Sequence, residues 1–145
     1  MKISIGSDHR GFELKSKIIE NFKKIEWLDV GTDLGANQRV NYPMFAQKVC
    51  KNILEKKSEQ GILICGSGIG IAIAANRFKK IYAGLCWDKE VAKAAKEHDN
   101  INVLVLPADF VNNNQAIEII NAWLSSEFKF GIYKERLDSI DSIDL

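Results

Sequence analysis

Cysteine is scarce and widely spaced in this chain of 145 residues. Its three cysteines, Cys50, Cys65 and Cys86, are odd in number and form no C-x-x-C pair. A disulfide framework or a zinc site is therefore not expected. Free thiols fit a reducing environment, so the sequence predicts a cytoplasmic protein.

Long hydrophobic runs and an excess of one charge are also missing. No segment approaches the roughly 18 apolar residues of a membrane helix, and the N-terminus enters a strand pattern at once rather than a signal peptide. With 20 basic and 19 acidic residues, the formal net charge is +1. Neither nucleic acid nor a membrane is thus indicated as a partner, and an anionic ligand has to be held by local groups.

A regular alternation of apolar runs and helical periodicity fills the chain. Strands are predicted over residues 2–7, 26–30, 61–65, 81–86 and 102–106, with a polar loop containing Gly35 and Asn37 over residues 31–42. Helices are predicted over residues 11–24, 43–53, 69–78, 88–97, 113–126 and about 133–143. This pattern predicts one α/β domain over residues 1–145, a doubly wound, Rossmann-like sheet of five parallel strands with helices on both faces.

Ligands bind such sheets beyond the carboxyl ends of the strands, and polar or reactive side chains follow two of the predicted strands. Asp8, His9 and Arg10 come after the first. Cys65 ends the third and precedes a glycine-rich turn, which comprises Gly66, Ser67, Gly68, Ile69 and Gly70. Backbone N–H groups in such a turn favour a thiolate and can bind an oxyanion. A buried structural cysteine and a helix-capping aspartate are the competing interpretations, and the location at strand ends favours function for the turn.

The spacing of this turn excludes three familiar phosphate loops. Ile71 stands where a dinucleotide fingerprint beginning at Gly66 requires glycine, and where a cysteine phosphatase loop requires arginine. No Gly-Lys-Ser/Thr sequence ends the turn, so it is not a P-loop. A second histidine, His98, and Asp99 lie at the end of the fourth predicted helix, where His98 either complements the helix dipole or serves as a general acid.

Five segments together carry a resemblance that covers essentially the whole chain. They are Gly6 to Lys15, Asn41-Tyr42-Pro43, Gly61 to Gly70 with Ala74-Ala75-Asn76, Glu97-His98 and Asn102-Val103-Leu104. These segments resemble the motifs of the type B ribose-5-phosphate isomerases, a family that also includes the galactose-6-phosphate isomerase subunits. The resemblance implies an aldose–ketose isomerase that needs no metal or organic cofactor. It also implies a homodimer or homotetramer whose sites are shared between subunits. The C-terminal helix of one subunit is expected to dock on a neighbouring subunit.

The resemblance also implies roles for single residues. Cys65 would be the base that moves a proton between C1 and C2, with the enediolate stabilised by N–H groups of Gly66 to Gly70. Ser67 would steer a substrate hydroxyl, Asp8 would hold sugar hydroxyls, and His98 would open the furanose ring. The remaining residues expected to bind substrate are His9, Arg10, Tyr42, Asp99 and Arg136.

Three residues depart from the family pattern, and they bear on the substrate. Asp99 replaces a usual asparagine, while Asp109 and Ile132 stand where arginines are common. Either Arg10, Arg39 or Lys134 compensates for the missing phosphate contacts, or the substrate is not ribose 5-phosphate. A six-carbon sugar phosphate, an unphosphorylated sugar, a non-catalytic sugar-binding module and a hydrolase with Cys65 as nucleophile are the alternatives.

Overall fold

The computed structural model describes residues 1–32 and 39–144. Its strands are β1 (Lys2–Ser7), β2 (Glu26–Asp29), β3 (Gln60–Cys65), β4 (Ala83–Leu85) and β5 (Val103–Pro107). Its helices are α1 (Phe12–Asn21), α2 (Tyr42–Leu54), α3 (Ile69–Ala75), α4 (Lys89–Asp99), α5 (Asn113–Ser125) and α6 (Ile132–Asp141). Gly35 and Asn37 of the predicted polar loop lie outside the described residues.

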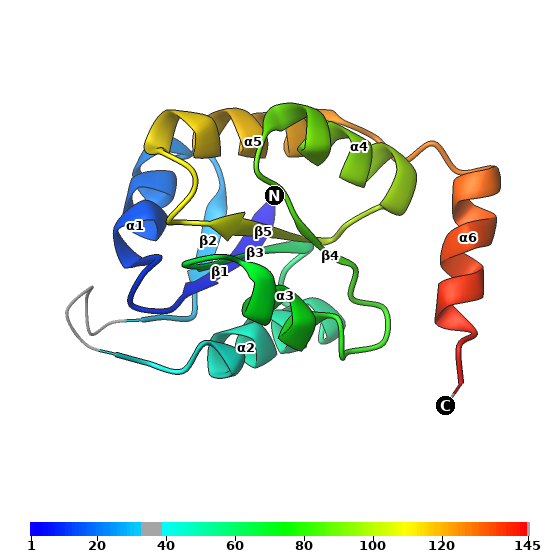
Figure 1. Cartoon of the computed structure of the whole chain (residues 1–145), viewed down its shortest axis with the longest axis horizontal. Coiled ribbons are helices and arrows are strands. Elements are labelled where there is room, and N and C mark those ends of the chain that lie inside the picture. Colours follow the sequence, from blue (N-terminus) through cyan, green and yellow to red (C-terminus); the bar gives the residue numbers. More distant parts are fainter. Residues whose placement is uncertain (33–38, 145) are drawn as a thin grey trace.

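The strands form one parallel sheet in the order β2-β1-β3-β5-β4. Helices α1, α4 and α5 cover one face and α2 and α3 the other, which confirms the predicted doubly wound architecture (Figure 1). Side chains alternate between two cores, since Ile62 and Ile64 of β3 join one while Leu63 and Cys65 join the other. The central strands read as continuous apolar runs because both of their faces are buried.

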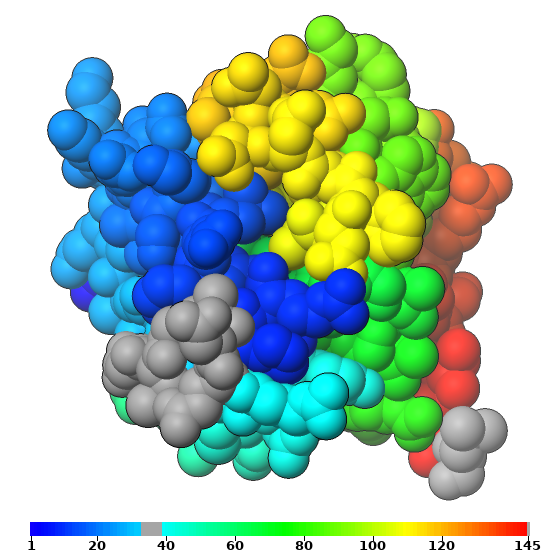
Figure 2. Space-filling model, turned by 60° about the vertical axis from the view of Figure 1, so that its left-hand side comes forward, coloured from blue at the N-terminus to red at the C-terminus, as the bar shows by residue number. Residues whose placement is uncertain are grey.

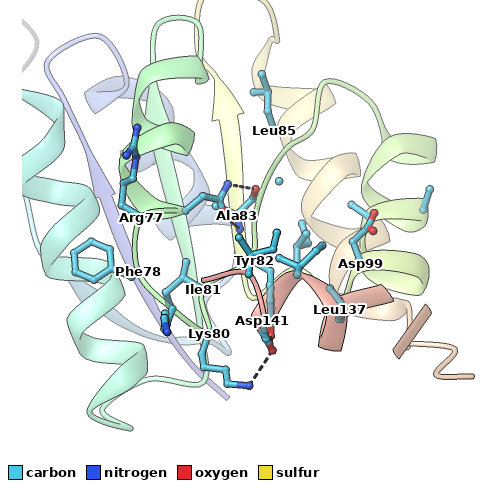
Figure 3. Close-up of a pocket in the computed structure, with 18 of the residues that line it drawn as sticks. Arg77, Phe78, Lys80, Ile81, Tyr82, Ala83, Leu85, Asp99, Leu137 and Asp141 are labelled. Atoms are coloured by element: carbon cyan, nitrogen blue, oxygen red, sulfur yellow. Dashed lines mark hydrogen bonds and ion pairs between the residues drawn. The ribbon is translucent and has the colours of Figure 1, made fainter. Parts of the chain in front are cut away.

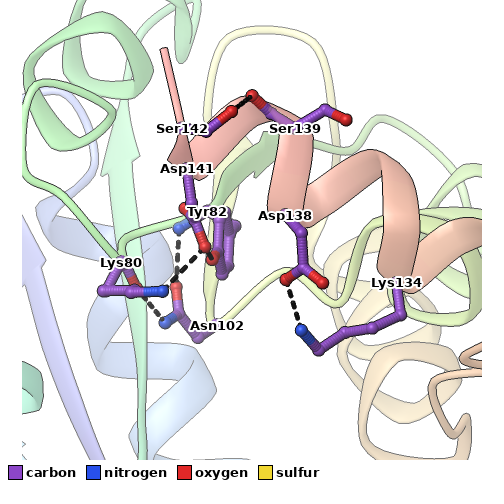
Figure 4. Close-up of polar contacts among 8 residues, drawn as sticks. All are labelled: Lys80, Tyr82, Asn102, Lys134, Asp138, Ser139, Asp141 and Ser142. Carbon is purple, nitrogen blue, oxygen red and sulfur yellow. Dashed lines mark hydrogen bonds and ion pairs between the residues drawn. The ribbon is translucent and has the colours of Figure 1, made fainter. Parts of the chain in front are cut away.

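Helix α6 stands beside the sheet rather than on either face (Figure 1). It packs against α4, and its Leu137 is buried in this chain. Near its end, Asp141 accepts hydrogen bonds from Tyr82 Oη at 2.6 Å and Lys80 Nζ at 2.8 Å (Figure 4). Burial, followed by the bond to Asp141, raises the pKa of Tyr82 to about 12, so the phenol stays a donor at neutral pH. This cluster fixes α6 to the β4 side of the molecule.

Strand β4 is shorter than predicted, and α3 ends at Ala75 rather than Phe78. Two asparagine side chains explain both differences. They form hydrogen bonds with backbone groups of residues 80–83 that a longer strand would pair with its neighbours. Asn76 donates to Ala83 O at 2.9 Å and accepts from Ala83 N at 2.8 Å. Asn102 bonds Lys80 O and Tyr82 N, each at 2.9 Å (Figure 4).

The helices of the described residues include none that is long and apolar enough to cross a membrane. The three cysteines are free and buried.

Candidate active site

The carboxyl ends of β1, β3 and β5 converge on one edge of the sheet. Backbone hydrogen bonds continue past the strand ends and join their loops, from Asp8 N to Ile64 O at 3.2 Å and from Asp109 N to Gly66 O at 3.0 Å. Figure 2 shows this edge: the dark blue segment after β1 lies between the yellow segment after β5 and the green and cyan segments of α3 and α2. The sequence-predicted residues that follow β1 and β3 are therefore neighbours.

Cys65 lies at the centre of this edge and is 5% exposed. Burial raises the pKa of its thiol, and the backbone N–H groups of Ile71, Gly68 and Ser67 lower the pKa by a smaller amount. The nearby charge of Asp8 adds to the rise. The N–H groups thus act as the sequence predicts, but desolvation of the sulfur outweighs them.

The glycine-rich turn has a geometry that larger residues would disturb. Gly68 has φ +77°, a left-handed conformation that non-glycine residues rarely adopt, and it forms the N-cap of α3. A Cβ on Gly70 would lie 2.4 Å from Tyr42 Oη, so the tyrosine covers the turn directly. Ser67 Oγ accepts from Ile69 N at 3.2 Å, which steadies the turn.

Asp8 and His9 combine a local structural role with free hydrogen-bonding groups. Oδ1 of the buried Asp8 accepts from Arg10 N at 2.9 Å and Gly11 N at 3.2 Å, as the capping interpretation requires. Its Oδ2 receives no hydrogen bond from the described part of the chain. Nδ1 of His9 accepts from Val40 N at 3.3 Å, so a neutral imidazole carries its proton on Nε2 and can donate it to a ligand.

An ion pair between Arg10 and Asp109 crosses the glycine turn. A Cβ on Gly66 would lie 2.8 Å from both Arg10 Nε and Asp109 Oδ2, which places the pair directly above the residue after Cys65. The sequence singled out both residues but did not predict their contact, because they are 99 positions apart. Arg10 is therefore already paired rather than free to replace a missing phosphate contact.

His98 does not join Cys65 within one chain. Three residues separate the end of β4 from helix α4, which starts at the carboxyl edge, and its 11 residues carry His98 to the opposite edge of the sheet. At 1.5 Å per residue, this is roughly 15 Å along the helix. There the imidazole stacks on Tyr133 of α6, with ring centroids 4.5 Å apart and an interplanar angle of 13°.

The other predicted residues at this second edge are exposed. Arg136 lies over the Tyr133 ring, with its guanidinium carbon 5.8 Å from the centroid, and Ile132 and Asp99 face solvent. Lys134 is paired with Asp138 on α6. Arg39 lies at the other edge, next to Val40, whose N–H contacts His9, and it is also exposed. Tyr133 was not singled out from the sequence, because a tyrosine in an amphipathic tail gives no signal of its own.

A groove of about 670 Å³ runs between α6 and the β4 side of the sheet (Figure 3). Asp99 and Leu137 line it, together with the exposed Trp87 and Ile140. Cys65 does not line it, so the groove is distinct from the thiol-containing edge. The described residues include no group of three or more His, Cys, Asp or Glu side chains that could hold a metal ion.

Comparison with known proteins identifies the family of this chain. A family model described as ribose/galactose isomerase matches residues 3–140. The chain belongs to the ribose/galactose isomerase family. Among the relatives of this family member, a putative sugar phosphate isomerase of Rickettsia bellii is 44% identical over 141 residues, covering 96% of both chains. Ribose-5-phosphate isomerase B of Escherichia coli is 35% identical over 145 residues, covering 99% of this chain and 96% of its own.

Solved structures of family members superimpose closely on this one. A ribose 5-phosphate isomerase of Thermotoga maritima has a TM-score of 0.94 at 41% identity, covering 98% of both chains. Ribose-5-phosphate isomerase B of Mycoplasma genitalium, solved with bound ribulose-5-phosphate, has a TM-score of 0.90 at 37% identity. That comparison covers 97% of this family member and 93% of the other chain.

The environment of the three cysteines predicts selective alkylation. Iodoacetamide should modify Cys65 first, because Cys50 and Cys86 are fully buried and burial raises the pKa of each to about 12. Since only the thiolate reacts, and the pKa of Cys65 is also raised, the rate should climb as the pH rises above neutral. Peptide mass spectrometry at a series of pH values measures this, with Cys65→Ser as the control. A rate already at its plateau at neutral pH would contradict the raised pKa.

Proposed function

We propose that this chain interconverts ribose 5-phosphate and ribulose 5-phosphate, with Cys65 as the base. The observation that carries the proposal is a buried thiol at the end of β3, faced by backbone N–H groups of the glycine turn, in a chain of this isomerase family. The relatives named for this activity, one of them solved with ribulose-5-phosphate, support the choice of substrate. Three free thiols fit a cytoplasmic enzyme.

The proposed reaction moves one proton between two carbons and one between two oxygens, and it needs no oxidant. The thiolate of Cys65 takes the proton from C2 of the open-chain aldose while the carbonyl at C1 becomes an enediolate oxygen. N–H groups of the turn stabilise that oxygen, and a raised pKa makes the thiolate a stronger base toward carbon. The proton returns at C1, and the proton of the C2 hydroxyl passes to O1 as the carbonyl forms at C2. Oδ2 of Asp8 and the Ser67 hydroxyl hold sugar hydroxyls, and Nε2 of His9 donates to the sugar tail or phosphate.

We assign the opening of the sugar ring to His98 of a second copy of the chain. His98 and Arg136 lie at the edge of the sheet opposite Cys65, so a site containing all three requires two chains. The exposed apolar side chains support such an association. Ile69 and Ile73 lie one turn apart on α3, next to the glycine turn, and are 57% and 55% exposed, while Trp87 is 56% exposed. A partner packed on this face would stand beside Cys65.

The Arg10–Asp109 pair favours one alternative substrate. A substrate phosphate at this edge must compete with the Asp109 carboxylate for Arg10, whereas an unphosphorylated sugar would not. A six-carbon sugar phosphate remains a further alternative. A non-catalytic binding module would show saturable binding without turnover, and a hydrolase would form a covalent adduct of Cys65 with an ester.

The reaction is tested by NMR of ribose 5-phosphate in deuterated water. The wild-type protein should form the ketose with deuterium at C1, and the aldose pool should gain deuterium at C2. Cys65→Ala should slow both by about 10²- to 10⁴-fold, because the base is removed. Cys50→Ala is the matched control and should retain activity. No conversion by a folded wild-type protein rejects ribose 5-phosphate, and galactose 6-phosphate and ribose are then assayed in the same way.

The shared site is tested by mixing two inactive variants. Cys65→Ala and His98→Ala chains, unfolded and refolded together at equal amounts, should regain about a quarter of the wild-type activity, since half of the dimers are mixed and each has one intact site. Each variant refolded alone should stay inactive. Mixtures that also stay inactive, while mass spectrometry shows mixed dimers, would place both residues in one chain's site.

The role of Asp109 is tested with Asp109→Asn, which removes the charge and keeps the shape. The KM for ribose 5-phosphate should fall by about two- to fivefold, a modest effect because the pair is partly exposed. The kcat should not change, and neither should the KM of any unphosphorylated sugar that is turned over. Glu55→Gln, which breaks an exposed pair with Lys57 at the end of α2, is the control. A higher KM for ribose 5-phosphate would show that Asp109 positions Arg10 for the substrate instead of competing with the substrate for Arg10.

A further inference from the structure

The ring of His98 is oriented by stacking rather than by hydrogen bonds. Its plane is within 13° of the Tyr133 plane, at a centroid distance of 4.5 Å. Neither ring nitrogen of His98 makes a hydrogen bond within the part of the chain that the structure describes. A histidine is commonly oriented by a hydrogen bond to one nitrogen, which removes that nitrogen from other use. In this structure Tyr133 holds one face of the His98 ring, and both ring nitrogens stay available for hydrogen bonds to a ligand.

Tyr133 is itself fixed by the backbone next to His98. Lys129, which lies between α5 and α6, donates its N–H to Glu97 O at 3.0 Å, and its Nζ pairs with Glu97 Oε2 at 2.6 Å. Because Glu97 precedes His98, the segment leading to Tyr133 is attached one residue away from the imidazole. Burial of Leu137, one helical turn after Tyr133, holds the rest of α6. These contacts within one chain thus set the distance between the His98 and Tyr133 rings.

We propose that Tyr133 is a positioning residue for His98, a role that rests on the proposed function. During ring opening the proton leaves O1, the C1–O4 bond breaks as C1=O1 forms, and O4 takes up a proton. An imidazole that relays this proton must keep a nitrogen free of other hydrogen bonds and hold its ring in a fixed plane. The stack on Tyr133 meets both requirements. Arg136 lies over the same ring, so α6 would bring His98 and Arg136 to the substrate as one unit.

The experiment compares Tyr133→Leu with Tyr133→Phe, which keeps the aromatic face. The chain has two histidines, so the imidazole proton resonances of His98 and His9 can be followed separately by NMR. Tyr133→Leu should remove the ring-current shift of His98 and leave His9 unchanged. Tyr133→Phe should preserve both signals. Tyr133→Met, similar in length and without a ring, serves if the leucine variant does not fold.

Kinetics separate ring opening from proton transfer at carbon. Ribose 5-phosphate closes to a furanose through O4, whereas ribulose 5-phosphate cannot close a five-membered ring, because its O5 carries the phosphate. Tyr133→Leu should slow conversion of the aldose by about three- to tenfold, the size of one aromatic contact. Exchange of the C1 proton of the ketose for deuterium should keep the wild-type rate. Tyr133→Phe should restore conversion.

Two results would overturn the proposal. Unchanged His98 resonances and unchanged conversion in Tyr133→Leu would show that the stack does not orient the ring. An equal loss of conversion and of ketose exchange would show that Tyr133 acts through the fold. Failure of the proposed function looks different, since the wild-type protein would then neither convert the aldose nor exchange the ketose, whatever the state of the stack.

Discussion

The backbone hydrogen bonds that continue the sheet beyond its strand ends are the constraint on which the thiol-containing edge depends. Strand β3 is bonded to β1 and β5 on its two sides and buried on both faces. Ala108 N donates to Cys65 O at 2.9 Å and Asp109 N to Gly66 O at 3.0 Å, so the turn is held at its first two residues. The sulfur therefore has little freedom, and its position relative to Asp8 is set by the sheet rather than by side-chain contacts.

The positions of the residues at the opposite edge of the sheet depend on contacts between helices. His98, Tyr133 and Arg136 lie on two helices whose ends are joined by the Lys129–Glu97 pair and by Leu137. Lys129 is more than half exposed, and an ion pair that water screens contributes little to stability. Burial of the apolar side chain and the aromatic stack therefore carry most of this arrangement. One edge is held by the sheet and the other rests on a small interface, which suits the proposed role of His98 in the site of a second copy.

Much of the fold was predictable because parallel strands buried on both faces leave continuous apolar runs, as in Ile62 to Cys65 and Val103 to Leu106. The neighbourhood of Asp8 and Cys65 was predictable as well, since it follows from strand direction alone. The Arg10–Asp109 pair was not, because no local pattern links residues so far apart. The separation of His98 from Cys65 follows from the direction of α4, but the contact with Tyr133 depends on a connection between α5 and α6 that has no periodic signature.

Asn76 has a consequence for how copies of this chain can meet. Its side chain occupies both backbone hydrogen-bonding groups of Ala83, which face away from β5, whereas Asn102 bonds groups of Lys80 and Tyr82 on the β5 side. An edge strand with unpaired groups can recruit a further strand, and repetition of that step has no natural end. Here that route is closed at Ala83, which favours contacts through exposed side chains on this side, such as Trp87 and Ile140. Side-chain surfaces are specific in shape, and association through them stops once each is covered.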